Sequence, residues 1–206
     1  RNGQANPKIL VVTDIILVVP GTEFLIDGPL AKYAHQGAEI TLICTTVGDE
    51  VASVDSIEVT EIYEKELMSA RAILGLHYIP CIFSVTQTAA CSLQMLNGDF
   101  ESDKRNGRIR PCVVITARQY DDSGHDHNIA ISCLATTAFD RAYLKSLVPL
   151  SSRLCYLVSY KIIRDHDVSL SRGLAAAPMI RINITDYLLT KAHAIHCHMT
   201  NSPHRS

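Results

Sequence analysis

The stretch "ILVVTDIILVVPGTE", from Ile9 to Glu23, is an apolar, β-branched run that ends in a turn and an acid. Continuous runs of this kind are typical of strands that a parallel sheet buries on both faces. Farther along the chain, strand-like and helix-like segments alternate, which is the pattern of a parallel sheet covered by helices. The sequence therefore predicts an α/β fold with a mainly parallel sheet flanked by helices, whose first strand reaches Val19.

The next expected element is a helix with Asp27 as its N-cap, Pro29 in its first turn and Gly37 as its stop. Pro80 weakens the strand that contains it or moves it to a sheet edge. Further strands are expected in "AEITLICTT" (38–46), "HYIPCIFSV" (77–85), "IRPCVVITA" (109–117), "RLCYLVSYKII" (153–163) and "MIRINI" (179–184). Further helices are expected in "SIEVTEIYEKELMSARAILG" (56–75), "IAISCLATTAFDRAYL" (129–144) and "TDYLLTKAHAIHCHM" (185–199), the last capped by Thr185 or Asp186.

The composition favours a globular protein with a small partner. The chain has 206 residues, of which 47% are hydrophobic and 19% are charged, which suits a single well-buried domain over residues 1–206. A net charge of -2 and a pI near 6.5 leave no basic field for nucleic acid or an anionic membrane surface. The longest apolar stretch is also shorter than the ~20 residues that span a bilayer. A small-molecule partner is therefore expected.

The cysteines indicate a reducing compartment. The chain has seven of them, an odd number, widely spaced and without a C-x-x-C pair. This pattern suits reduced thiols in the core of a cytoplasmic protein better than a disulfide framework or a zinc knuckle.

Two loops are expected at the carboxyl ends of parallel strands, where open α/β sheets place their sites. One is "PGTE", which ends at Glu23, and the other lies in "RQYDDSGHDHN" (118–128). The second loop holds Asp121, Asp122, His125, Asp126 and His127, and imidazoles beside carboxylates are favoured ligands for zinc. A solvated polar turn is the competing interpretation of the same residues.

Asp14 and the late histidines are further candidates. An acid within an apolar run is costly unless it is paired or lies at a strand end. Asp14 is therefore a ligand candidate if the strand ends at Val12, and otherwise a carboxylate bonded to nearby backbone or a lysine. On a helix, His198 cannot share one face with both His193 and His196, so these three are more typical of a polar helix end than of a metal site.

Several stretches together resemble the LmbE-like, or PIG-L, family of zinc-dependent N-deacetylases, which hydrolyse the acetamide of N-acetylglucosamine conjugates on a Rossmann-like sheet. The family pattern opens with A-H-P-D-D-E and continues to L-A-K-Y-A-x-x-G-x-E-V-T-L. The similar stretches here are "PGTEFLIDGPLAKYAHQGAEITLICTT", "EKELMSARAILGL", "RIRPCVVITA", "GHDHNIAISCLATTAF" and "INITDYLLTKAHAIHCHMTN". The resemblance runs from Ile9 to about Asn201 and implies a three-layer Rossmann-like fold in a hydrolase. A cytoplasmic protein that acts alone or as a homo-oligomer is expected.

The first family motif is degenerate in this chain. The places of its two zinc ligands and its general base are held by Val19, Thr22 and Gly21, and Glu23 is the acid that remains. Valine and glycine carry no ligand or base, and a threonine hydroxyl is a poor ligand for zinc.

The other motifs supply the remaining site residues that the resemblance implies. His127 matches a metal ligand, His125 matches an acid or oxyanion stabiliser, and Asp126 lies between them, in a loop one residue shorter than H-P-D-H. His198 matches the late histidine that reaches the substrate, and Asn201 stands where glutamine is usual.

The chemistry of the family shows what these replacements affect. A catalytic zinc needs three protein ligands and an open position for water, and a carboxylate removes a proton from that water. The interpretation adopted here is a zinc-dependent deacetylase of an amino-sugar conjugate, with His127 and Asp14 toward the metal, with His125, Asp126 and Glu23 as catalytic residues, and with His198 toward the substrate. A family member that binds sugar or a partner without catalysis, and a divergent or altered form of an active enzyme, are the alternatives.

Overall fold

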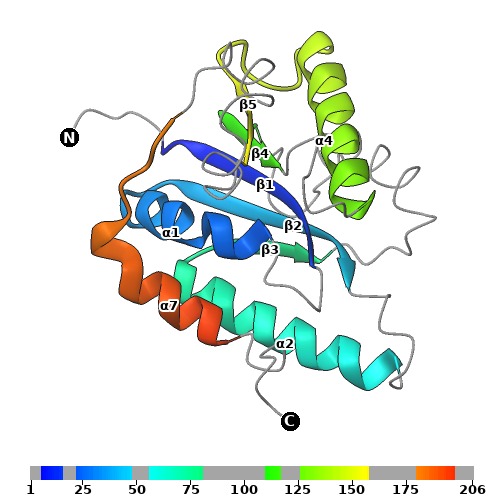
Figure 1. The fold of residues 1–206 in the computed structure, drawn as a ribbon. Helices are drawn as coiled ribbons and strands as arrows, with labels where there is room; N and C mark the ends of the chain where they lie inside the picture. The colour runs from blue at the N-terminus through cyan, green and yellow to red at the C-terminus, as the bar shows by residue number, and fades with distance from the viewer. Residues whose placement is uncertain are drawn as a thin grey trace, which may run out of the picture.

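A computed structural model describes residues 6–15, 22–47, 56–80, 110–116, 126–157 and 180–197 (Figure 1). Its strands form a five-stranded sheet in the order β3-β2-β1-β4-β5, and every neighbouring pair is parallel. The strands are β1 (Lys8–Ile15), β2 (Glu39–Val47), β3 (His77–Pro80), β4 (Val113–Thr116) and β5 (Arg153–Tyr156). The helices are α1 (Thr22–His35), α2 (Ser56–Leu74), α4 (Asp126–Leu144) and α7 (Leu188–His196), with a short 3-10 helix η1 (Thr185–Tyr187). The prediction of an α/β fold is confirmed.

The first strand occupies the centre of this sheet, between β2 and β4. Its side chains alternate between the two faces: Ile9 and Val11 belong to one buried cluster, and Leu10 and Val12 to another. An apolar residue at each of these positions explains why the run reads as continuous rather than alternating. The strand is described as far as Ile15, and the predicted extension to Val19 lies outside the described residues.

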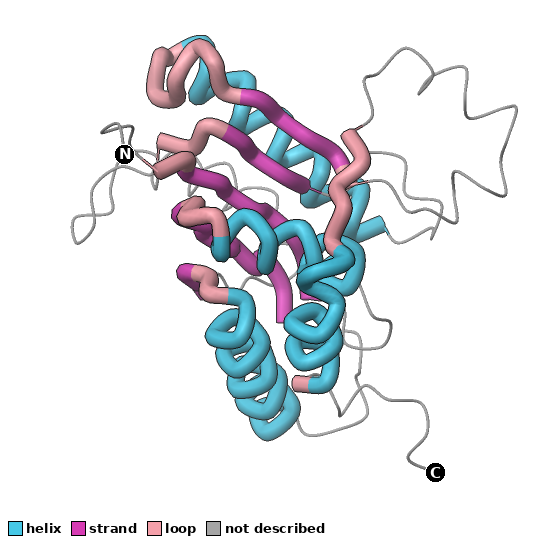
Figure 2. The backbone as a smooth tube through the Cα atoms, turned by 90° about the vertical axis from the view of Figure 1, so that its left-hand side faces the viewer, coloured by secondary structure: helices cyan, strands magenta, loops and turns pink. Residues whose placement is uncertain are grey.

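Helices cover both faces, which gives three layers (Figures 1 and 2). Buried residues of α1, α2 and α7 share a cluster with β1 and β2, whereas those of α4 share a cluster with β1, β2 and β4. We call these the α1 face and the α4 face of the sheet. The three-layer arrangement expected for a Rossmann-like fold is therefore present.

Two helices begin earlier than predicted. α1 begins at Thr22, so Asp27 is not its N-cap and Pro29 lies inside the helix. The helix continues through Pro29 although proline supplies no N–H for the helical ladder. Likewise, α4 begins at Asp126, so Asp126 and His127 open a helix instead of ending a loop.

The predicted helix ends are correct where glycine follows. α1 ends at His35 before Gly37, and α2 ends at Leu74 before Gly75. Both glycines have positive φ, +93° and +71°, a conformation that side chains with a Cβ disfavour. Pro80 lies in β3, which is the outer strand on its side of the described sheet, as its sequence predicted.

The chain before α7 differs from its prediction. Within "MIRINI", the described residues 180–184 form no strand. Asn183 has another function, because its Oδ1 accepts hydrogen bonds from the backbone N–H of Thr185 (2.9 Å) and from its hydroxyl (2.7 Å). The prediction of Thr185 or Asp186 as the N-cap is wrong. The N-cap of η1 is Ile184, and that of α7 is Tyr187.

The described cysteines are free thiols, but they are not core residues. Cys133 is exposed, and Cys112, Cys155 and Cys197 are half-buried. Burial raises the pKa of the Cys155 thiol, which favours its protonated form. Among the described residues, no helix is both long and apolar enough to cross a membrane.

Candidate functional site

The strand order places a topological switch point between β1 and β4. From β1 the chain passes through α1 to β2, which is the neighbour of β1 on one side in the sheet. The neighbour of β1 on its other side is β4, which comes later in the chain. In an open parallel sheet, ligands bind outside the carboxyl ends of the strands at such a switch point. Here those ends are Ile15 and Thr116, and Val12 pairs with Thr116 in the register of the two strands.

Four of the predicted site residues belong to the elements that end or begin at this edge. Asp14 is the penultimate residue of β1, and Glu23 lies in the first turn of α1. Asp126 and His127 open α4, the first described helix after β4. The fold thus brings the backbone of three acids and one histidine to the β1–β4 switch. His125 and His198 lie outside the described residues.

The helix starts add a favourable field at this edge. The N-terminus of a helix carries a partial positive charge and unpaired N–H groups, so it stabilises carboxylates nearby. Glu23 and Asp126 occupy the first turns of α1 and α4. The backbone of these two residues therefore lies where the helix N-termini carry partial positive charge.

Asp14 lies at an irregularity of the sheet. Thr13 pairs with Cys44 of β2, but Ile15 pairs with Val47, so the register shifts between Thr13 and Ile15. Shifts of this kind bend a strand, re-aim its side chains and are frequent beside active sites. The strand continues past Val12, so the alternative in which "TD" forms a loop is wrong, although Asp14 still lies at the carboxyl end.

On the α4 face, polar groups lie next to the carboxyl end of β4. Thr116 is fully buried, and its hydroxyl has no hydrogen-bond partner among the described residues. The neighbouring strand contributes Tyr156, whose hydroxyl lies 2.8 Å from Oγ1 of Thr136 on α4. The hydroxyl of Thr136 also lies 2.7 Å from the backbone oxygen of Ser132. Sequence reasoning missed this cluster, because isolated threonines in apolar segments carry no spacing signal.

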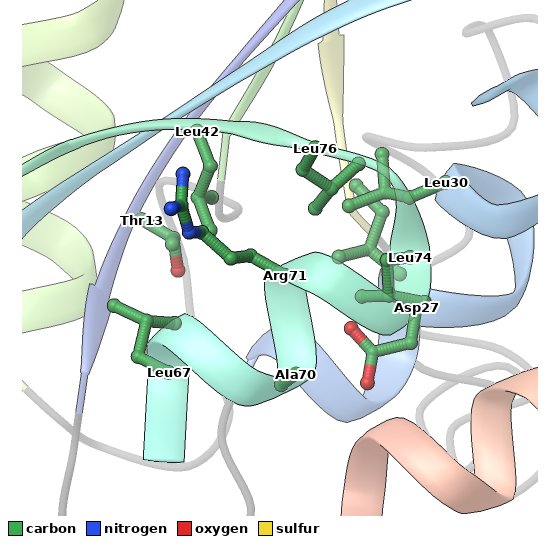
Figure 3. A pocket seen from close by; sticks show the side chains of 10 residues that line it. Thr13, Asp27, Leu30, Leu42, Leu67, Ala70, Arg71, Leu74 and Leu76 are labelled. Atoms are coloured by element: carbon green, nitrogen blue, oxygen red, sulfur yellow. The ribbon is translucent and has the colours of Figure 1, made fainter. Parts of the chain in front are cut away.

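On the α1 face, a cavity of about 20 Å³ holds charged side chains among apolar ones (Figure 3). Its polar lining comes from Thr13 of β1, Asp27 of α1 and Arg71 of α2. Figure 3 shows the guanidinium of Arg71 directed toward the side of the cavity that holds Thr13, whereas the carboxylate of Asp27 is directed toward α7. The cavity therefore lies between the carboxyl half of β1 and the helices α1 and α2.

The carboxyl of Asp27 is the most perturbed acid among the described residues. Its residue is 3% exposed, and its Oδ2 has no hydrogen-bond partner within the described structure. Burial raises its pKa to about 7, against the charge of Lys191, which lowers it. The sequence signal that identifies this burial is helical spacing, since Asp27 precedes the buried Leu30 and Ala31 by three and four positions.

The predicted site residues Asp14, Glu23, Asp126 and His127 carry the kinds of donor atom that bind a divalent metal. Carboxylate oxygens and an imidazole nitrogen are ligands that zinc accepts. Within the described side chains, no three His, Cys, Asp or Glu residues gather closely enough to hold a metal ion. The side chains of Asp14, Glu23, Asp126 and His127 are not among those described, so the ligand set stays a prediction.

Comparisons of sequence find no relative. No model of a known protein family matches the chain, and no curated protein matches its sequence.

Solved structures do match the fold. One is GalB, the 4-carboxy-2-hydroxymuconate hydratase from Pseudomonas putida KT2440, with a TM-score of 0.66 at 16% identity over 93% of this chain and 78% of that one. Another is the N,N'-diacetylchitobiose deacetylase from Pyrococcus horikoshii, solved with an inhibitor, with a TM-score of 0.66 at 15% identity over 96% of this chain and 71% of that one.

A third similar structure is the zinc-inhibited form of the teicoplanin deacetylase Orf2. It has a TM-score of 0.59 at 13% identity, over 93% of this chain and 83% of that one. At such low identities the likeness concerns the fold. The resemblance that the sequence motifs suggested is thus matched in three dimensions: the chain has the fold of LmbE-like deacetylases, which it shares with a hydratase.

Proposed function

We propose that this protein is a metal-dependent hydrolase that removes the acetyl group from an N-acetylglucosamine-type conjugate. The observation that carries the proposal is the convergence of Asp14, Glu23, Asp126 and His127 on the β1–β4 switch. Deacetylases among the structures with this fold support the reaction type. We place the activity in one domain of a cytoplasmic protein that acts alone or as a homo-oligomer.

The proposed division of labour follows the chemistry of amide hydrolysis. Zinc, when bound, polarises the acetamide carbonyl and lowers the pKa of water. His127 and Asp14 are the residues that would hold it. The carboxylate of Glu23 would take the proton of the attacking water, and His125, oriented by Asp126, would protonate the leaving amine. His198 would contact the substrate.

A non-catalytic function is the second candidate. It is favoured by Val19 and Gly21, which offer neither a ligand nor a base where the deacetylase motif has them. The hydratase with the same fold also illustrates that this fold does not fix one reaction. In this candidate the protein keeps a sugar-binding or interaction surface without turnover.

Metal analysis of the purified protein tests the proposal most directly. We expect stoichiometric zinc in the parent and its loss in His127→Ala. His193→Ala is the matched control, because His193 is an exposed histidine of α7 and its replacement should leave the metal content unchanged. A parent without bound metal, or equal loss in both variants, would remove the metal-dependent hydrolase from consideration.

A product assay separates the reaction types. Incubation with N-acetylglucosamine conjugates should release acetate and a free amine in equal amounts, and Glu23→Gln should abolish both. Addition of water to a double bond releases neither product. Binding of the conjugate without acetate release, in a protein that holds zinc, would favour the non-catalytic candidate.

A further inference from the structure

Asp27 lies where three helices meet. It belongs to α1, shares its cavity with Arg71 of α2, and has the charge of Lys191 of α7 acting on it. Its carboxylate is directed toward α7 in Figure 3. Its Oδ2 has no hydrogen-bond partner among the described residues, so the charge of Lys191 offsets only part of the cost of burying the ionised carboxylate.

The cavity cannot hydrate an ionised carboxylate. Its volume of about 20 Å³ is close to that of one water molecule by the same measure. Seven of the ten residues that line it are apolar, from Ile26 to Leu76. The protonated form of Asp27 is therefore the one that this environment favours.

The chain from Asn183 onward docks on α1 next to this acid. Nζ of Lys32 donates a hydrogen bond to the backbone oxygen of Asn183 at 2.9 Å. Ile184 packs so closely on Gly28 that an added Cβ would overlap its side chain. Farther along, the fully buried Ala194 brings α7 into the core cluster of the α1 face. α7 thus belongs to the packing around the helix that carries Asp27.

We propose that Asp27 is a proton-linked latch that holds α7 on α1 and α2 when it is protonated and loosens that helix when it ionises. Ionisation inside the closed junction leaves a buried charge, whereas ionisation in the opened junction is hydrated. Binding of a proton to Asp27 therefore favours the closed form, and loss of that proton favours the open form, in which water solvates the carboxylate.

The charged groups on the packed elements fix the sign of this effect. α2 contributes Arg71 and Glu66, and α7 contributes Lys191 together with the exposed His193 and His196. Among these, Lys191 is the group whose charge acts on Asp27, and it favours the ionised form. The strands β1 and β2 contribute uncharged lining. Burial outweighs the lysine, so the closed form retains the proton up to neutral pH.

Hydrogen exchange at several pH values tests the latch in the full chain. After correction for intrinsic exchange rates, we expect the protection of α7 amides to fall about ten-fold between pH 6 and pH 8. Asp27→Asn should abolish the fall, because asparagine does not titrate. Asp140→Asn, which removes an exposed acid on α4, is the matched control and should retain it.

A second variant keeps the test decisive if Asp27→Asn folds poorly. Lys191→Met removes the charge that favours ionisation, so the same loss of α7 protection should occur at higher pH. The proposal is overturned if α7 protection has no pH dependence, if Asp27→Asn keeps that dependence, or if Lys191→Met moves it to lower pH.

Discussion

The two faces of the sheet bury polar groups of different kinds. The α4 face buries the neutral hydroxyls of Thr116 and Ser132, whereas the α1 face buries Asp27 in a cavity that Arg71 also lines. A buried hydroxyl costs little beyond an unmade hydrogen bond, and its cost does not change with pH. The free-energy cost of burying a carboxyl depends on pH, because the ionised form costs more to bury than the protonated form. The comparison teaches that, among the described buried side chains, the α1 face holds a titratable carboxyl and the α4 face holds only hydroxyls.

The largest effect should come from shortening a fully buried side chain on each face. Leu30→Ala on the α1 face and Ile131→Ala on the α4 face should each lower the free energy of unfolding by about 3 kcal/mol in denaturant titrations. Leu30 also lines the cavity, so its truncation admits water to Asp27. The pH dependence of stability should therefore weaken in Leu30→Ala and not in Ile131→Ala; equal profiles would contradict the comparison.

The next effect concerns the pH profile of Asp27 itself. Burial raises its folded pKa to about 7 from the ordinary value of 3.8, so its stabilising contribution is present below about pH 4 and is lost as the pH rises toward 7. Asp27→Asn should thus gain about 2 to 3 kcal/mol on the parent between pH 5 and pH 8. Urea titrations at both values measure the gain, and a constant difference between the two proteins would refute it.

A smaller effect is expected from Gly28, where Ile184 packs on α1. Gly28→Ala places a methyl group against that side chain and should cost about 2 kcal/mol, because overpacked sites adjust only in part. Thermal unfolding and the protection of α7 amides would both record the loss. An unchanged unfolding temperature would mean that the 183–197 segment shifts without cost.

The smallest effect should appear at Thr116, on the face whose described buried polar groups are uncharged. Thr116→Val replaces a buried hydroxyl that has no described partner, so stability should change by less than about 1 kcal/mol. The change should be the same at pH 5 and pH 8. A difference between the two pH values would show that the α4 face is also coupled to a titrating group.

The sequence predicted the sheet better than the helix starts. An apolar strand such as β1 is specified by its own residues, and the glycines at 37 and 75 stop helices through their own backbone freedom. Asp27 was misread because an acid before a proline is also a common helix start. Only the packing of α7 and α2 around it distinguishes a cap from a buried acid.

The candidate site was predictable in position and not in detail. Strand order and helix starts bring Asp14, Glu23, Asp126 and His127 to one edge, and the motif order suggested this from the sequence. The hydroxyl of Thr116 and the cavity at Asp27 were not predictable, because both arise from contacts between elements far apart in the chain. Local pattern carries no information on such contacts.

The bond from Lys32 to Asn183 joins residues 151 positions apart. During synthesis, α1 therefore leaves the ribosome long before the segment that will cover it exists. Without that cover, a hydrated Asp27 carboxyl with its ordinary pKa of 3.8 would be ionised at neutral pH. Docking of α7 on α1 would then be accompanied by uptake of a proton by Asp27 at or below about pH 7.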